Sequence, residues 1–327
     1  MSTHTLHHHI VTGSLTLPLS VVLTLVAWLL PGTGDSLLWG GAAVTLLTAY
    51  MVMELNNRFS LIRIRSRLMS SLFLWLMLAC PMLHLWSADA VSVVCLAGCY
   101  FMLFSSYQQI RPEGHVFYAF LLTGIGSLFF PPMLVLAAGH YTSMIFLLRC
   151  MNGRSFAAGL LGLALPYGAV AGYAIWQNRL DTAFDHLQGW LSLSVQDYAQ
   201  ITLWQLVMAA FVAVYALLGV IHLLRTAYND KIRTRMLLYV ITAQELLLLV
   251  LLCLLPAHFE AMMRLFILNS TPLIAHYFAL ARGRFFKTWF YVSLLALTAL
   301  AVFNYLCLYG PLHELSQLRP LAGLLPL

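Results

Sequence analysis

The chain has 327 residues, of which 61% are hydrophobic and only 9% are charged. A soluble domain carries about 25% charged residues, so this chain could not cover a water-facing surface with polar side chains. Its formal net charge of +6 comes without a basic stripe interleaved with aromatic residues, the pattern typical of nucleic-acid binding. The composition therefore excludes a soluble globular domain and predicts a membrane protein with no nucleic-acid partner.

The apolar residues form long blocks without alternation. A helix that crosses a bilayer needs roughly 17–25 such residues, and lipid admits only helices or closed barrels. Barrel strands would alternate over about ten residues, which these blocks do not. We predict an all-α, polytopic bundle of about eleven transmembrane helices, within a range of roughly nine to twelve. The expected spans are 15–31, 36–54, 67–86, 89–107, 114–130, 132–150, 156–176, 201–224, 236–256, 261–281 and 286–309.

Two of these spans and the N-terminal segment leave questions open. Spans 114–130 and 132–150 are short and meet at Pro131-Pro132, so they predict either two thin crossings or a re-entrant pair. The first 14 residues hold no Lys or Arg, so no cleavable signal peptide is expected. Their histidines have no fixed geometry, so neither a metal site nor a cofactor is expected.

The basic residues predict the sidedness of the bundle. Lys and Arg resist translocation, and 14 of the 17 lie in even-numbered connections between spans. The N-terminus is therefore predicted to be cytoplasmic and the C-terminus external, in a bacterial inner membrane. These 14 residues are Arg58, Arg63, Arg65, Arg67, Arg111, Arg149, Arg154, Arg225, Lys231, Arg233, Arg235, Arg282, Arg284 and Lys287.

One long connection, 177–200, divides the sequence into two predicted bundles. Its apolar residues, among them Leu187 and Trp190, fall on one helical stripe, which predicts an external amphipathic helix lying in the membrane interface. Residues 1–176 would form a bundle of seven transmembrane helices. Residues 201–327 would form a bundle of four.

Three stretches resemble an uncharacterised family of polytopic inner-membrane proteins from Bacteroidota. They run from Leu55-Asn56-Asn57-Arg58 to Pro81, from Phe117 to Pro166, and over 271–278. The resemblance implies the multi-pass fold, and the family carries no assigned chemistry.

A second, shorter resemblance covers about 114–176. Residues 118–133, with Arg149, Arg154 and Pro166 downstream, are similar to the core helix pair of GT-C glycosyltransferases. Those enzymes take sugars from polyprenyl-phosphate carriers and present a catalytic carboxylate on their first external loop. In this chain that loop is short, and Asp35 is its only acid.

Glu245 is the residue most indicative of a buried site, because it lies near the middle of a predicted span. A charge there costs roughly 2.5–3.5 kcal/mol on insertion scales, so the side chain should face the bundle interior, be protonated or have a partner. Asn269 and Thr271 lie level with it on the next, antiparallel span, and Pro272 frees a backbone carbonyl nearby. We predict a substrate-binding cluster or, alternatively, structural hydrogen bonds of about 0.6 kcal/mol per pair. Its members would be Glu245, Gln244, Asn269, Thr271 and His276.

The predicted outer helix ends supply a second set of candidates. Glycosyl transfer needs a carboxylate base, for which Asp35, Asp89 and Glu260 are available. A lipid-linked phosphate would bind a cation such as Arg264, with His258 close by in the sequence. The alternative interpretation is the ordinary polarity of a membrane interface.

The leading functional hypothesis is that the protein handles a lipid or a polyprenyl-phosphate-linked substrate in cell-envelope biogenesis, as a GT-C-like enzyme or without catalysis. One alternative is a transporter or flippase whose path is lined by the Glu245 cluster. Another is a non-catalytic subunit that anchors other membrane proteins. The chain has none of the phosphate-binding, metalloprotease or serine-hydrolase motifs that would indicate a soluble enzyme's chemistry.

Overall fold

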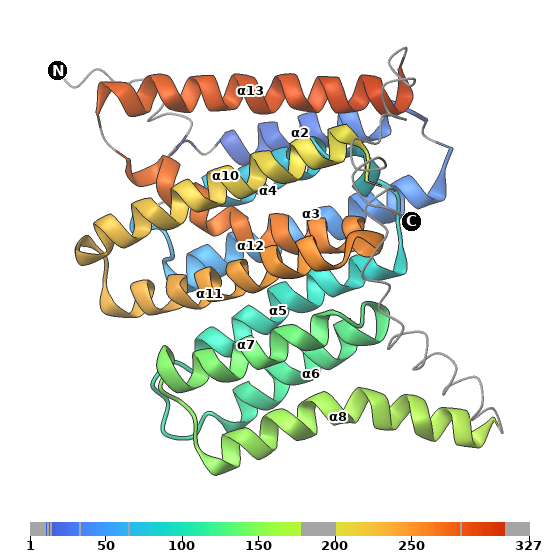
Figure 1. The fold of residues 1–327 in the computed structure, drawn as a ribbon, viewed down its shortest axis with the longest axis vertical. Coiled ribbons are helices and arrows are strands. Elements are labelled where there is room, and N and C mark those ends of the chain that lie inside the picture. Colours follow the sequence, from blue (N-terminus) through green and yellow to red (C-terminus); the bar gives the residue numbers. More distant parts are fainter. Residues whose placement is uncertain are drawn as a thin grey trace, which may run out of the picture. The chain divides into compact units, whose positions relative to one another are not determined.

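The computed structural model describes residues 11–310 except 12, 14, 33, 65, 178–200 and 282. This part of the chain is helical and contains no strand, and each predicted span overlaps one of its eleven α-helices (Figure 1). The predicted interfacial helix lies outside the described residues, apart from Gln177. The helices are α2 (Thr16–Leu29), α3 (Ser36–Phe59), α4 (Leu68–Leu78), α5 (Val91–Ser105), α6 (Glu113–Phe129), α7 (Met133–Phe146), α8 (Gly153–Trp176), α10 (Leu203–Thr226), α11 (Ile232–Leu254), α12 (Phe259–Leu280) and α13 (Arg284–Tyr309).

The structure confirms that the chain contains several helices suited by length and composition to cross a membrane. Six helical segments in the described part of the chain are long and apolar enough to cross a bilayer. They are Ser36–Phe59, Ala88–Ser105, Gly153–Trp176, Leu203–Asn229, Ile232–Leu254 and Phe285–Tyr309. Helices α2, α4 and α7 are apolar but shorter than 18 residues.

Helix α4 differs most from its predicted span of 67–86. It has 11 residues and ends at Leu78, and Pro81 then opens a separate 3-10 turn, Pro81–Leu83. Proline has no backbone N–H to continue an α-helix, so the apolar run Leu68–Leu83 is divided between a helix and a turn.

The described residues form two compact units that alternate along the chain. Unit 1 comprises the described parts of Met1–Ser87, Tyr198–Thr242 and Phe266–Leu327. Unit 2 comprises the described parts of Ala88–Asp197 and Ala243–Leu265. These boundaries differ from those of the predicted seven-helix and four-helix bundles, because α11 and α12 each contribute to both units.

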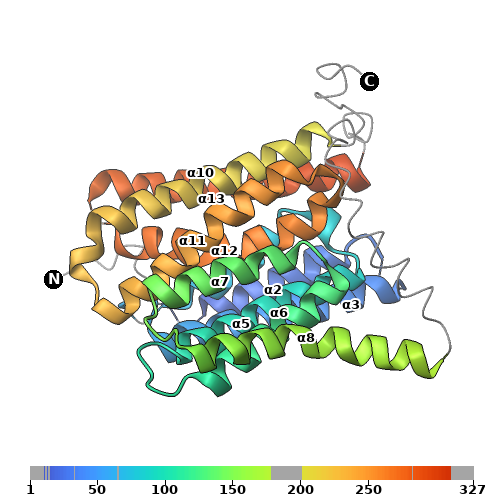
Figure 2. The same cartoon turned by 60° about the horizontal axis from the view of Figure 1, so that its bottom comes forward.

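Unit 2 is built around α6. This helix packs against α5, α7 and α8, and α8 runs along it in both orientations (Figures 1 and 2). Glycine permits the contact with α8, since a Cβ atom at Gly162 would lie 2.5 Å from the Phe117 carbonyl oxygen.

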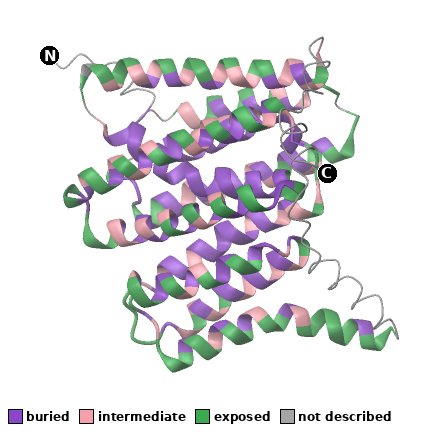
Figure 3. Cartoon of the chain, in the orientation of Figure 1, coloured by how far each residue is buried: buried purple, intermediate pink, exposed green. Residues whose placement is uncertain are grey.

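Unit 1 is built around α4, which packs against α2, α3 and α13. Helix α13 also contacts α10 and exposes much of its surface, as does α8 of unit 2 (Figure 3). Helix α12 is the opposite case, because every residue from 261 to 280 is buried. Apolar faces such as that of α13 are the surfaces that lipid would cover.

Candidate functional site

Glu245 is buried, with 4% of its surface exposed, and Asn269 and Thr271 are fully buried. The Asn269 side-chain amide donates a 2.9 Å hydrogen bond to the carbonyl of Ile241, one turn before Glu245 on α11. Thr271 donates to the Ile267 carbonyl of its own helix. A shared cluster of Glu245, Asn269 and Thr271 stays a prediction.

Gln244 takes part in a different network, inside unit 2. Its Nε2 lies 2.9 Å from His140 Nδ1, and His140 Nε2 lies 3.4 Å from the Cys99 sulfur. Thr123 donates to the same sulfur at 3.4 Å. Gln244, His140, Cys99 and Thr123 are all fully buried, so this network is a polar core connecting four helices.

The outer-face candidates divide into two groups. In unit 2, Arg264 Nη1 lies 2.6 Å from Asp89 Oδ2, and Glu260 stands one turn before Arg264 on α12. The His258 ring lies edge-on to Phe130, with 5.9 Å between the centroids. In unit 1, Asp35 caps α3 by accepting a 2.8 Å hydrogen bond from the Leu37 N–H. Asp89 and Asp35 thus have structural partners, which makes them poorer candidates for a general base.

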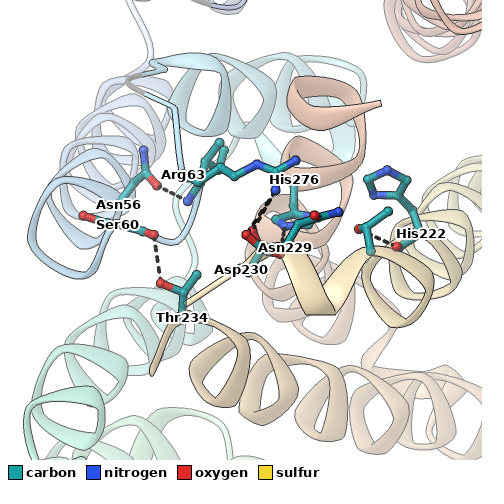
Figure 4. A network of polar contacts seen from close by, with 10 residues as sticks. Asn56, Ser60, Arg63, His222, Asn229, Asp230, Thr234 and His276 are labelled. Carbon is teal, nitrogen blue, oxygen red and sulfur yellow. Dashed lines mark hydrogen bonds and ion pairs between the residues drawn. The ribbon is translucent and has the colours of Figure 1, made fainter. Parts of the chain in front are cut away.

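The most extensive charged network lies in unit 1 and centres on Asp230 (Figure 4). Asp230 sits between α10 and α11, and its side chain is 1% exposed. Its Oδ2 lies 3.1 Å from His276 Nε2, and its Oδ1 lies 3.7 Å from Arg63 Nη1. The His222 ring stands beside that of His276, with 5.7 Å between the centroids. His276 therefore belongs to the Asp230 network, whereas its place in the sequence predicted a cluster with Glu245.

The same network holds the loop between α3 and α4. Arg63 also donates to the Asn229 carbonyl at 3.3 Å, and Thr234 donates to the Ser60 carbonyl at 3.3 Å. From the last turn of α3, the Asn56 side chain accepts a 3.0 Å hydrogen bond from the Ile62 N–H of the loop and donates to the Ser66 carbonyl. These contacts fix the backbone that leads into the first residue of α4.

Helix α4 forms one wall of an apolar cavity inside unit 1, with a volume of about 70 Å³. Its α4 wall is lined by Leu68, Ser71, Leu72, Trp75 and Leu76, and the remaining residues come from α2, α10, α12 and α13. Two of the lining hydroxyls pair with each other, since Tyr215 lies 2.8 Å from Ser293. The full lining is Thr16, Ser20, Leu68, Ser71, Leu72, Trp75, Leu76, Phe211, Tyr215, Ile274, Phe278, Phe290, Ser293, Leu294 and Leu297.

Neither the cavity nor the Asp230 network has a precedent among the comparisons. No family model, characterised protein or solved structure matches the chain. Among the described residues, no group of three or more His, Cys, Asp or Glu side chains is arranged to hold a metal ion.

Proposed function

We propose that the protein is a multi-pass protein of the bacterial cytoplasmic membrane with eleven crossings, a cytoplasmic N-terminus and an external C-terminus. The coincidence of the eleven predicted spans with eleven helices supports this count. The concentration of Lys and Arg in alternate connections supports the sidedness. A role in the cell envelope is part of the proposal.

Its proposed activity is the handling of a membrane lipid or a lipid-linked substrate, whose hydrocarbon chain occupies the cavity of unit 1. The observation that carries the proposal is the lining of this cavity. Five aromatic rings and six Leu or Ile side chains surround it, and its polar groups are the Ser, Thr and Tyr hydroxyls and the indole N–H of Trp75. Such a surface binds hydrocarbon and excludes ionic solutes. The volume of about 70 Å³ is enough for a short segment of one acyl or prenyl chain.

Photoactivatable lipids test this proposal. A diacyl phospholipid and a polyprenyl phosphate, each with a diazirine in its chain, would be incorporated with the purified protein into nanodiscs. We expect crosslinks on peptides of α4 and α13. Leu294→Trp should remove them by filling the cavity. Leu295→Trp is the matched control, because the neighbouring Leu295 is 71% exposed. Equal labelling of both variants would overturn the proposal.

Transport of a polar solute is a second candidate, favoured by the burial of an ionisable residue at mid-helix in α11. Glu245 is 4% exposed, and ionisable residues within membrane helices commonly mark substrate or proton pathways. Glu245→Gln keeps the shape and hydrogen bonding of the side chain but removes its charge. In a transporter this variant should fold normally and lose proton-coupled flux in proteoliposomes. Unchanged flux would assign Glu245 a structural role.

A further inference from the structure

Ser70 and Ser71 of α4 are adjacent, buried serines whose hydroxyls have no hydrogen-bond partner among the described residues. This is unusual for serine in a helix, which commonly donates to the carbonyl four residues earlier. Ser20 and Ser293, two other serines of the cavity lining, do so. Only Ser71 of the α4 pair lines the cavity, where it is 2% exposed.

An unpartnered buried hydroxyl costs about 1–3 kcal/mol. A ligand that offers an acceptor to Ser71 would recover this cost, whereas plain hydrocarbon would not. The hydroxyl therefore indicates a ligand with an oxygen atom at the level of Ser71, inside an otherwise apolar cavity.

Arg67 places a positive charge close in sequence to Ser71. Arg67 immediately precedes α4 and stands four residues, one helical turn, before Ser71, so both belong to the same side of the helix. After Ser71 along α4, the cavity lining continues with Leu72, Trp75 and Leu76. Along the chain from Arg67 to Leu76, a cation just before the cavity lining is followed by a hydroxyl and then by apolar side chains, over about 14 Å.

No carboxylate opposes this charge on the helices that surround the cavity. Helices α2, α4, α10 and α13 contain no Asp or Glu, and the one acid of α12, Glu260, lies at the end of the helix remote from Ile274 and Phe278. An anionic ligand group near Arg67 would therefore meet no carboxylate repulsion from these helices.

We propose, building on the proposed lipid-handling function, that the ligand is an acyl-ester glycerophospholipid. Its phosphate would lie against Arg67, its ester carbonyl would accept a hydrogen bond from Ser71, and its acyl chain would run along Leu72 and Leu76. The glycerol carbons between phosphate and ester span a distance comparable with one helical turn, about 5.4 Å. A polyprenyl phosphate has the anionic group and the chain but no carbonyl for Ser71.

Three probes distinguish these ligands: a 1-acyl lysophosphatidylglycerol, its 1-alkyl ether analogue, and a polyprenyl phosphate. Their affinities for the purified full-length protein would be measured by native mass spectrometry. One neutral hydrogen bond corresponds to about fivefold in affinity. We therefore expect the ester to bind about fivefold more tightly than the ether. Ser71→Ala should abolish this difference by weakening the ester alone.

Two variants complete the experiment. Ser70→Ala removes the neighbouring buried hydroxyl that does not line the cavity, and it should leave all three affinities unchanged. Arg67→Gln should weaken ester and ether lipids alike, by about tenfold or more, because it removes a charge-assisted contact with the phosphate.

The outcomes separate this inference from the function on which it rests. If Ser71→Ala weakened ester and ether equally, or if the polyprenyl phosphate bound best and was insensitive to Ser71→Ala, the ester assignment would be wrong while lipid handling stood. If Leu294→Trp left the binding of every probe unchanged, the cavity would not be a lipid site, and both proposals would fail.

Discussion

A buried carboxylate held between a guanidinium and an imidazole contributes modestly to stability while all three groups are present. Removing one of them leaves the others uncompensated, which typically costs about 3–5 kcal/mol. Asp230 is in this position, since it is almost fully buried between Arg63 and His276. We therefore expect Asp230→Ala to lower the free energy of unfolding by about 3–5 kcal/mol. Scanning fluorimetry in detergent would show this as a fall of several degrees in the apparent Tm.

Asp35→Ala is the matched control for this substitution. Asp35 is an exposed helix-capping carboxylate, and loss of such a cap costs about 1 kcal/mol. Arg63→Met combined with Asp230→Leu should be milder than Asp230→Ala alone, because it removes both charges together. Equal Tm values for Asp230→Ala and Asp35→Ala would show that the network does not stabilise the loop between α3 and α4.

At the scale of single elements, the hydrophobic pattern predicted where each helix lies. It predicted the ends of some helices poorly. The prediction for α2 was within two residues at each end, because its apolar run has Pro18 only in the first turn, where proline is tolerated, and stops at Pro31. The end of α4 was missed because an apolar sequence continues past Leu78 into the Pro81 turn. Composition alone cannot distinguish an apolar helix from an apolar turn packed in a core.

The contact between α6 and α8 provides a prediction at this scale. Gly162 of α8 faces the α6 backbone at a distance that leaves no room for a side chain. Gly162→Leu should therefore separate α8 from α6, in spite of its gain in helix propensity of roughly 1 kcal/mol. New protease cleavage within 150–177 and a lower apparent Tm would report the separation.

Gly172→Leu is the control for Gly162→Leu, on the same helix. No atom lies within 4 Å of a Cβ built at Gly172, so this variant gains the same propensity without a clash. We expect its stability to be unchanged or raised. Similar destabilisation by the two substitutions would mean that α8 does not depend on its contact with α6.

At the scale of the whole molecule, sequence predicted the all-helical class but neither the cavity nor the Asp230 network. The cavity is formed by five helices, from α2 to α13, and no local pattern shows which faces meet. Asp230 lies in a short polar connection and resembles any exposed turn residue. Its burial depends on Arg63 and His276, which are respectively 167 and 46 residues away along the chain.

The proposed topology gives the prediction for the whole chain. Reporter fusions at Arg63, Arg154 and Lys231 should be cytoplasmic, because these residues lie in connections enriched in Lys and Arg. Fusions after Asp185 and at the C-terminus should be external. Paired reporters, one active in the cytoplasm and one outside, would measure each site. An external reporter at Lys231 would contradict the count of eleven crossings.

The burial of every α12 residue from 261 to 280 has a consequence for the biogenesis of the protein. Its interior-facing polar residues, Asn269, Ser270 and His276 among them, lower its hydropathy, and it is not one of the six helical segments in the described part of the chain that are apolar enough to cross a membrane. A helix that carries these groups partitions poorly into lipid by itself. It would leave the translocon efficiently only when earlier helices are already there to receive its polar groups. Insertion of α12 should therefore depend on α11 and the connection before it, where Ile241 and Asp230 contact Asn269 and His276, and a nascent chain that lacks α11 should retain α12 in an exposed, degradable state.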